Sequence, residues 1–489
     1  VNPMPNCLNR SRFLIPPSCA LLLLTSNIAN NLVECEIKLR PLHTSIPKRE
    51  DFNFMNFISL NQPITLLKTL RSLLIVFLLT AAPAVFAQTI LNSPYSYLGM
   101  GEIQKSENVT NMMMGGIGVS NSNGIYTNVV NPALLARNRW TNLEVGINTE
   151  YKTLQDYRQQ QKVFGGNYQS LNLTLPITSR WTMAVGIRPH SAVEYETRSY
   201  RRLNLLGVDS LIYSYKGSGG VSKVSISNGV RIYKEFYVGL QMDYLFGQVN
   251  RNVATQNMSD GQYYKVQLED LTSYSDFQFK AGFAYRANLK PDLFLNLGAT
   301  LDLNSTLHAN QVKRFATMDL SGLTVINADT LEKSTDFVQQ IPIAKRFGLS
   351  LEKAAKWMVG VDYSYTDWSK VTNNLGRSAT LPASHKVSIG GEYTPDIESI
   401  SSFVKRTTYR LGASYEKTPY DFLGNGNYAV DKNLSFGVAL PLRNLSFLNI
   451  AYQVGRRGLI TENGMEEQYH RLTLGLTFSD LWFQKQKIN

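Results

Sequence analysis

The amino-acid sequence predicts an all-β protein, a transmembrane antiparallel β-barrel of about 14 strands with an N-terminal glycine-rich plug in its lumen. Three observations lead to this prediction. Apolar and polar residues alternate in one segment after another from residue 140 onward. Short connections between these segments alternate with longer polar ones. A segment with the features of an export signal precedes them all.

The first 87 residues differ in composition from the rest of the chain. They contain all 3 cysteines and no glycine, whereas the residues that follow contain all 34 glycines. Residues 55–87 have two basic residues, a short apolar run and then small residues, ending in Ala87, before a predicted cut, as in a secretory signal peptide. Because Met55 stands where such a peptide would begin, we interpret residues 1–54 as an overlong reading frame or, alternatively, an unusual leader.

The charge of the exported part excludes several functional classes. After residue 87 the chain has 41 Lys and Arg against 33 Asp and Glu, scattered without a polybasic run, so nucleic-acid binding has no support. The absence of cysteine there excludes a lipid-anchored lipoprotein, a disulfide framework and cysteine metal sites. We therefore expect a protein of the outer membrane of a Gram-negative bacterium, with no cofactor and no metal.

Period-two alternation defines the strands, as in "DLFLNLGATLDLN", where five leucines and an alanine share one face and polar residues or glycine occupy most of the other. After residue 88 no run of 18 apolar residues occurs, so spanning helices are not expected. The segments that alternate are 141–156, 167–178, 181–200, 221–233, 236–256, 271–289, 292–310, 342–353, 356–371, 383–396, 406–419, 429–442, 446–460 and 468–483.

The connections indicate how these strands are arranged. Very short ones such as "TSR", "KE" and "RNL" alternate with polar loops predicted at 201–220, 257–270 and 311–341, and 397–405 is intermediate in length. Short turns at one end and long loops at the other are typical of outer-membrane barrels, with both termini on the periplasmic side. A soluble β-sandwich rarely uses strands this long. The five tryptophans, Trp140, Trp181, Trp357, Trp368 and Trp482, lie near predicted strand ends, where membrane interfaces place them.

The face opposite the apolar one contains charges of both signs and many glycines. The glycines predicted to point into the lumen are Gly146, Gly186, Gly229, Gly239, Gly282, Gly298, Gly348, Gly360, Gly390, Gly412, Gly437, Gly455 and Gly475. Two explanations remain open. Either the missing side chains make room for a plug and a ligand path, or glycine relieves crowding and allows curvature in a closed sheet.

Residues 88–139 lie between the signal peptide and the predicted barrel, which extends over residues 140–489. Glycine, asparagine and serine dominate this segment, and "MMMGGIGV" is its only apolar patch, so it cannot form a core of its own. A tethered segment of this kind is suited to plug the lumen.

The motifs of this segment carry a resemblance. "GGIGVSNSNG" followed by "NPALLA" and then at once by the first strand resembles the hatch of the outer membrane protein transport family, which includes the FadL long-chain fatty acid transporters. The resemblance implies a fourteen-stranded barrel with an N-terminal hatch, hydrophobic ligands bound in the lumen, and release through a lateral opening. The hatch-motif residues are then Asn131, Pro132 and Ala133, with Gly115, Gly116 and Gly118 as weaker matches.

The ends of the exported chain carry a second resemblance. "SPYSYLGMGE" and "DLWFQKQKIN" are similar to a subgroup of that family from bacteria that use type IX secretion, in which some members are plug or shuttle subunits of the secretion apparatus. This leaves the substrate open. The Asn-Pro-Ala unit also has a physical role of its own, because Pro132 fixes its φ and Asn131 can bond to local backbone. We expect it to anchor the plug to the wall.

Transport of a hydrophobic or amphipathic, fatty-acid-like small molecule is the leading functional hypothesis, and membrane lipid is the expected surrounding partner. The inward cations Arg188, Lys280 and Arg410 are the candidates to meet a carboxylate. An accessory subunit that binds a barrel partner of a secretion machine is the alternative, and a nonspecific porin is the third. We expect no enzyme, because the four histidines that follow residue 87 have no shared spacing and no catalytic motif beside them.

Overall fold

A computed structural model describes residues 93–97, 99–104, 107–121, 123–205, 208–257, 264–303, 306–319, 325–371, 381–421, 423, 425–442 and 446–481, all within the unit Leu79–Asn489. The predicted signal peptide, the three cysteines and Trp482 lie outside these residues. The short helical elements are η2 (Pro94–Tyr97), α3 (Val109–Met112), η3 (Pro132–Arg137), α4 (Phe403–Arg406) and α5 (Ile460–Asn463). No helix in the described part of the chain has the length and apolarity needed to cross a membrane.

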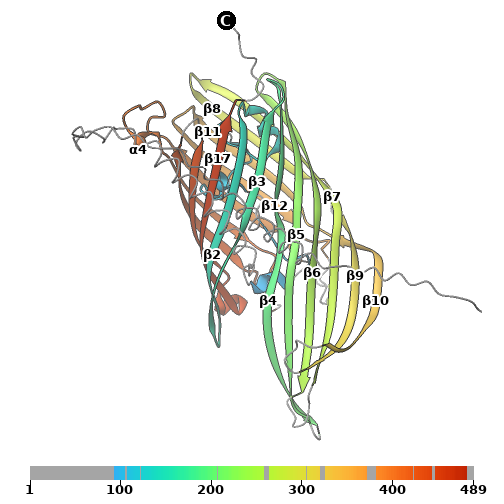
Figure 1. The fold of residues 1–489 in the computed structure, drawn as a ribbon. Coiled ribbons are helices and arrows are strands. Elements are labelled where there is room, and N and C mark those ends of the chain that lie inside the picture. The colour runs from blue at the N-terminus through green and yellow to red at the C-terminus, as the bar shows by residue number, and fades with distance from the viewer. Residues whose placement is uncertain are drawn as a thin grey trace, which may run out of the picture. The chain divides into compact units, whose positions relative to one another are not determined.

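The strands form one antiparallel sheet that closes on itself (Figure 1). They are β1 (Glu102–Ile103), β2 (Thr141–Asp156), β3 (Gln160–Pro176), β4 (Trp181–Leu205), β5 (Val208–Tyr233), β6 (Phe236–Asn257), β7 (Tyr264–Lys290), β8 (Leu293–Asp302), β9 (Thr306–Asp319), β10 (Val325–Gln340), β11 (Ile343–Lys353), β12 (Trp357–Asp367), β13 (Ser384–Tyr393), β14 (Thr408–Lys417), β15 (Val430–Pro441), β16 (Phe447–Arg457) and β17 (Met465–Asp480).

Fourteen strand positions make up the wall, as the sequence predicts. Each strand from β2 to β7 pairs with its successor, β8 pairs with β11, and each strand from β11 to β16 pairs with its successor. Strand β17 closes the barrel on β2. Strands β8 and β9 lie one after the other along the long β7, and β9 pairs with β10 beyond the point where β8 meets β11. Each of these two wall positions is therefore one strand with a break in it.

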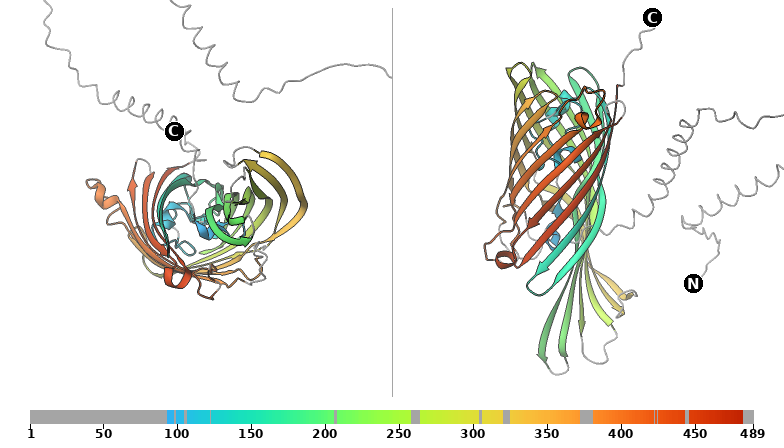
Figure 2. Two further views of the ribbon diagram at one scale, coloured as in Figure 1. Left: turned by 90° about the horizontal axis from the view of Figure 1, so that it is seen from below. Right: turned by 90° about the vertical axis from the view of Figure 1, so that its left-hand side faces the viewer.

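Three predicted loops are corrected by the structure. Much of 201–220, 257–270 and 311–341 is strand, because β4, β5, β6, β7, β9 and β10 continue through them. Figure 2 shows these strands, green to yellow, running on beyond the orange and red ones. Their apolar alternation fades there because strands beyond the bilayer have no face in lipid, while backbone pairing continues without it.

The predicted facing of the strands is confirmed along β8. Leu297 and Leu301 are 40% exposed on the outer surface, whereas the residues before them, Asn296 and Thr300, are 2% and 4% exposed inside. This inversion, with apolar residues outside and polar residues inside, is required of a wall whose solvent is lipid.

The N-terminal segment lies inside the ring of strands, where Figure 2 shows it in blue. Its apolar patch has no core of its own and packs on the wall instead. Met112, Met113, Met114 and Ile117 are at most 2% exposed, and their neighbours include residues of β12 and β16. We call residues 93–139 the hatch.

The inward glycines make the space that the hatch occupies. A Cβ added at eleven of the thirteen would lie within 3.4 Å of hatch atoms; these are Gly146, Gly229, Gly239, Gly282, Gly298, Gly348, Gly360, Gly390, Gly412, Gly437 and Gly475. The other two, Gly186 and Gly455, face Asn172 and Tyr469 of the wall. The room left by the missing side chains is thus filled by the hatch, which favours the first of the two explanations given above.

The tryptophans agree only in part with the interface prediction. Trp181, at the start of β4, is 39% exposed, and Trp357 begins β12. Trp368 is 9% exposed and lines a cavity in the lumen, so the prediction of an interfacial ring is wrong there. Its position just past a strand end did not distinguish an outward ring from one folded over the mouth.

Candidate functional site: the hatch, the lumen cavity and a seam in the wall

The Asn-Pro-Ala unit joins the hatch to the far wall of the barrel. Asn131 caps η3 by accepting a hydrogen bond from the Ala133 amide at 3.0 Å, and its Nδ2 donates to the carbonyl of Val119 at 2.7 Å and to that of Phe283 on β7 at 2.9 Å. Asn131 is fully buried, and Pro132 occupies the N1 position that proline favours. The unit therefore holds the hatch on itself and on β7.

Three wall glycines receive this unit. A Cβ at Gly239 would lie 2.3 Å from the Ala133 nitrogen, and one at Gly282 would lie 2.3 Å from the Asn131 side chain. At Gly229 the nearest atom is the Pro132 carbonyl oxygen, at 2.5 Å. The sequence places the anchor just before β2, but its packing partners belong to β5, β6 and β7.

The glycine-rich loop is held through its backbone. Gly115 and Gly116 have φ of +67° and +86°, the left-handed region that side chains disfavour, and Gly115 also packs against the backbone of Ala413. The amides of Gly118 and Val119 both donate to one carboxylate oxygen of Asp362 on β12, at 2.7 and 2.9 Å. The six hatch residues singled out by the sequence are thus all buried at contacts within the lumen.

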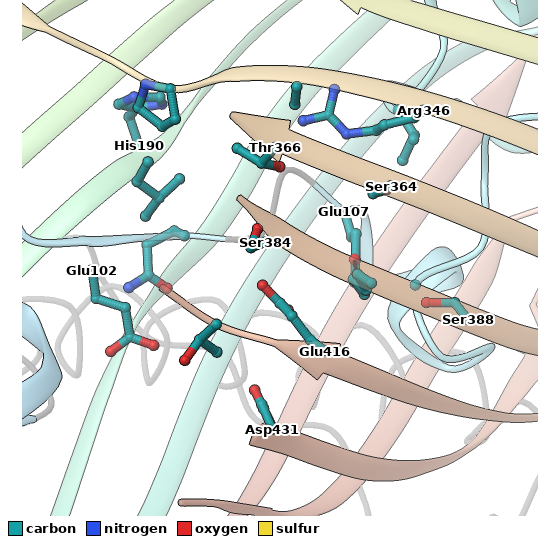
Figure 3. Close-up of a pocket in the computed structure, with 18 of the residues that line it drawn as sticks. Glu102, Glu107, His190, Arg346, Ser364, Thr366, Ser384, Ser388, Glu416 and Asp431 are labelled. Atoms are coloured by element: carbon teal, nitrogen blue, oxygen red, sulfur yellow. Dashed lines mark hydrogen bonds and ion pairs between the residues drawn. The ribbon is translucent and has the colours of Figure 1, made fainter. Parts of the chain in front are cut away.

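A cavity of about 210 Å³ lies between the hatch and the wall (Figure 3). Its lining includes six carboxylates and six cations from the hatch and from strands around the barrel, besides His190; these are Glu102, Glu107, Asp302, Asp362, Glu416 and Asp431, with Lys223, Lys280, Arg346, Lys386, Arg457 and Arg471. The cavity lining is therefore rich in charges of both signs. Apolar residues of the hatch, such as Met112, and of the wall, such as Ile341 and Trp368, lie between these charged groups.

Most of these cations are already paired. Lys386 Nζ bonds to Glu107 at 2.6 Å, Lys223 to Asp243 at 3.0 Å, and Arg346 approaches Asp302 at 3.4 Å. Arg457 contacts three carboxylates at 2.7 to 3.6 Å. Such networks leave few groups available to a ligand.

The three candidate cations fall into different environments. Arg410 forms a salt bridge with Glu392 at 2.9 Å and lies over the Tyr126 ring of the hatch, outside the cavity lining. Arg188 is 3% exposed and donates to Asn172 at 3.2 Å, again outside the lining. Lys280 alone of the three lines the cavity. The structure does not bring the three together.

Lys280 is also distinct in its partners. It is 5% exposed, and within the described part of the chain it has no hydrogen bond and no ion pair within 4.0 Å. Its direct neighbour on β8, Asp302, is instead bonded to Arg346. A buried ammonium without such a partner needs a compensating anion or water.

An apolar layer lies next to the cationic one. A buried cluster joins Met100 of the hatch to residues on or just after the extended strands, namely Val193, Val221, Leu245, Val249, Tyr274, Leu307, Ala309 and Ile341. Along β5, Val221 is one inward position beyond Lys223, and along β6 Leu245 is one inward position beyond Asp243. The lumen thus changes from charged around Lys223 and Asp243 to apolar on the side of the long strand extensions.

The wall has a short seam between β3 and β4. These two strands pair over only six positions, from Leu171 with Ile187 to Pro176 with Thr182. Past that point β3 stays with β2, and the hatch strand β1 takes the vacated edge of β4, with Ile103 opposite Ser191. A small cavity of about 40 Å³ lies here and shares Glu102, Gln104 and Asn148 with the larger one.

An ion pair fixes β1 at the seam. Glu102 Oε1 lies 2.7 Å from Arg457 Nη1 on β16. Burial alone would raise the pKa of Glu102, but the Arg457 guanidinium, with Lys152 nearby, outweighs it and lowers the pKa to about 2. The Gln104 amide also donates to the His190 carbonyl at 2.9 Å. Sequence alternation does not reveal β1, which has only two residues.

The described residues contain no cluster of three or more His, Cys, Asp or Glu side chains suited to hold a metal ion. The fold and the site together define a class: an outer-membrane β-barrel of fourteen strand positions whose lumen is closed by an N-terminal hatch.

The family follows from the sequence comparison. The model of the BamG family matches residues 69–489, and the chain belongs to that family. No protein with a curated description matches the sequence.

Solved structures of hydrocarbon transporters share this fold. The crystal structure of the P. putida toluene transporter TodX matches with a TM-score of 0.51 and 14% identity, covering 79% of this chain and 99% of that one. A TodX mutant lacking S2 and S3, a monoaromatic hydrocarbon channel, gives a TM-score of 0.51 at 13% identity, with 77% and 99% covered. A Pseudomonas aeruginosa FadL homologue gives 0.49 at 12%, with 78% and 98% covered. At such identities the likeness concerns the fold alone.

Proposed function

We propose that this protein transports an amphipathic small molecule with an anionic head and an apolar tail, such as a fatty acid, across the outer membrane. The observation that supports this most directly is the position of Lys280, a buried cation in the lumen cavity without an ion pair among the described residues. The apolar layer that begins with Val221 and Leu245 lies on the side of the long strand extensions. Head and tail of such a ligand would each find a matching surface.

The route past the hatch is the seam in our proposal. The ligand enters from the side of the long strand extensions, its head meets Lys280, and it leaves between β3 and β4 once β1 moves aside. Support comes from the six-position pairing of β3 with β4 and from the residues that both cavities share. Movement of β1 breaks one ion pair and a few backbone hydrogen bonds, whereas expulsion of the whole hatch would break all its contacts with the wall.

The role of Lys280 is tested by uptake into proteoliposomes. We expect Lys280→Met to lower uptake of a fluorescent fatty acid about ten-fold or more, because a charge-assisted hydrogen bond is lost. Uptake of the corresponding fatty alcohol should change little. Lys345→Ala, which removes an exposed cation on the outer face of β11, is the matched control. Equal losses for acid and alcohol would mean that Lys280 supports the lumen structure and does not recognise the head.

The exit route is tested with a disulfide lock. Ile103 and Ser191 are direct partners across β1 and β4, within the Cα separation that a disulfide requires. Oxidation of an Ile103→Cys, Ser191→Cys variant should stop uptake, and reduction should restore it. The control lock is Ser388→Cys with Ser414→Cys, a paired position in the wall between β13 and β14. Undiminished uptake in the oxidised β1 lock would exclude the seam as the exit.

An accessory role beside another barrel is the second candidate function. Its support is an exposed apolar patch on the connection between β13 and β14, at the end of the barrel that has the short turns. Ile400 is 96% exposed, Val404 63% and Phe403 48%, and α4 has no buried residue. Copurification of a stoichiometric barrel from native membranes, lost on Ile400→Asp with Val404→Asp, would favour this role. A monomer that retains lipid in its lumen would favour transport.

A nonspecific porin, the third candidate, has less support because hatch residues fill the space beside most of the inward glycines. The porin function requires measurable ion conductance through the barrel with the hatch in place.

A further inference from the structure

The outer surface of the barrel contains a groove away from the lumen. It runs over β13 to β17, has a volume of about 670 Å³ and faces lipid. Ala413 and Val454 form its floor, while the larger side chains of Ile389, Tyr415 and Leu434 rise beside it. A small residue among large outward neighbours leaves a depression in the outer surface.

Cations line one end of this groove. Lys432 on β15 and Arg456 on β16 are both exposed and lie directly opposite each other in the register of the two strands. Like charges at such a position repel and destabilise the pair. Glu466 offsets part of this charge through a salt bridge to Arg456 at 2.5 Å, while Lys432 lies 5.7 Å from the centre of the Tyr415 ring.

A histidine completes the cationic end. His470 on β17 is exposed and lines the groove, and its Nδ1 is bonded to the Tyr452 hydroxyl at 2.8 Å. With the hydroxyl donating to Nδ1, the ring proton lies on Nε2, which is then a donor for an anion. The Lys432 ammonium, the Arg456 guanidinium and the neutral His470 ring thus each offer a hydrogen-bond donor beside one apolar groove.

The location of this end identifies the leaflet. Lys432 is two residues from the start of β15, and Arg456 is one residue from the end of β16, at the strand ends opposite the short turns. In an outer-membrane barrel that end is extracellular. The groove therefore meets lipids of the outer leaflet, whose headgroups lie at the level of these cations.

We propose that this groove is a specific binding site for a phosphorylated glycolipid of the outer leaflet. One acyl chain lies over Ala413, and a phosphate is bound by Lys432, Arg456 and His470. Charge complementarity selects this occupant, because the phosphate relieves the repulsion of the two facing cations and the ammonium and guanidinium both donate to phosphate oxygens. A neutral lipid fills the same groove without relieving that repulsion.

The test uses the full-length protein in phosphatidylcholine nanodiscs doped with lipid A, with bound lipid measured by native mass spectrometry. We expect one lipid A to remain bound on the wild-type protein, and its retention to fall roughly 30-fold in Lys432→Ala with Arg456→Ala, since each basic residue near a membrane surface adds to anionic lipid binding. Ala413→Leu, which fills the floor, should lower retention as well. Lys345→Ala, an exposed outward cation two strands from the groove, should leave it unchanged.

Heat-modified mobility on gels verifies that each variant is folded before lipid is measured. Equal retention of lipid A by the double variant and by Lys345→Ala would overturn the proposal. So would displacement of lipid A by phosphatidylcholine alone, or by inorganic phosphate at equal concentration, because the site would then recognise an acyl chain only or a phosphate only.

Discussion

Substitution of Gly239 by alanine is the sharpest test of the hatch anchor. An added Cβ would lie 2.3 Å from the Ala133 nitrogen and 2.3 Å from the Pro132 carbonyl carbon. Both are backbone atoms, so no flexible side chain can turn away. Ordinary contact begins near 3.4 Å, and η3 must therefore move by roughly 1 Å.

The cost of that movement can be worked from the contacts of Asn131. Its Nδ2 bonds at 2.7 and 2.9 Å lengthen beyond hydrogen-bonding distance if η3 shifts by roughly 1 Å away from β6. Each bond contributes about 1 kcal/mol, and a buried amide left without a partner adds about 1 to 3 kcal/mol. A total of about 3 to 5 kcal/mol raises the population with a displaced anchor by at least roughly 100-fold.

Two assays measure this population: single-channel conductance in planar bilayers, and cleavage of the hatch by protease in folded barrels. We expect both to increase in Gly239→Ala, with little change in barrel melting. Gly455→Ala is the matched control, because its Cβ also meets an atom at 2.3 Å, but that atom belongs to the Tyr469 ring of the wall. If the two variants behave alike, or if Gly239→Ala is as tight as wild type, the hatch is not held where we infer.

Three further predictions concern the same hatch. Pro132→Ala should increase leak and change uptake while the barrel assembles normally, because the preset φ of the anchor is lost; failure to assemble would show that the turn is a folding element. Asp362→Ala should make the glycine loop protease-sensitive, since two consecutive backbone amides lose their acceptor, at about 2 to 4 kcal/mol in all; an unchanged cleavage rate would contradict this. The Glu102 to Arg457 contact should be complete above about pH 4.5 and be lost as the pH falls toward 2, because the folded-state pKa is lowered to about 2; hydrogen exchange of β1 should follow that window in the wild type and not in Glu102→Gln.

The strands of the wall were predictable because lipid requires an apolar outward face on every strand that crosses the bilayer. Residues 141–156 match β2 at both ends, and 236–256 match β6 to within one residue. The same rule does not identify the strand segments that lie outside the bilayer. Beyond the bilayer the outward face no longer needs to be apolar, so β10, with "NADTLEKSTD" in it, reads as a polar loop although its backbone pairs with β9.

For the candidate site, the sequence predicted only which side chains point into the lumen. Alternation places Arg188, Lys280 and Arg410 on the inner face, and all three are buried there. What decides their roles is strand register, which one sequence does not contain. Register places Glu392 directly opposite Arg410, and the two side chains form an ion pair. Register also places Asp302 opposite Lys280, but Asp302 forms its ion pair with Arg346. The two-residue strand β1 and the facing pair of Lys432 with Arg456 depend on register in the same way.

The hatch divides into an anchor and a gate by the strength of its contacts. Residues 108–137 pack against eleven wall glycines, at each of which an added Cβ would clash with the hatch. Moving this part of the hatch therefore breaks several packing contacts at once. Strand β1 has two register partners on β4 and one charged tie to Arg457. Glu102 and Lys280 line the same cavity, so in the proposed transport a ligand at Lys280 would act on the weaker part. Its anionic head would compete with the Glu102 carboxylate for the local positive charge and favour release of β1, while the anchor would keep the lumen closed to ions.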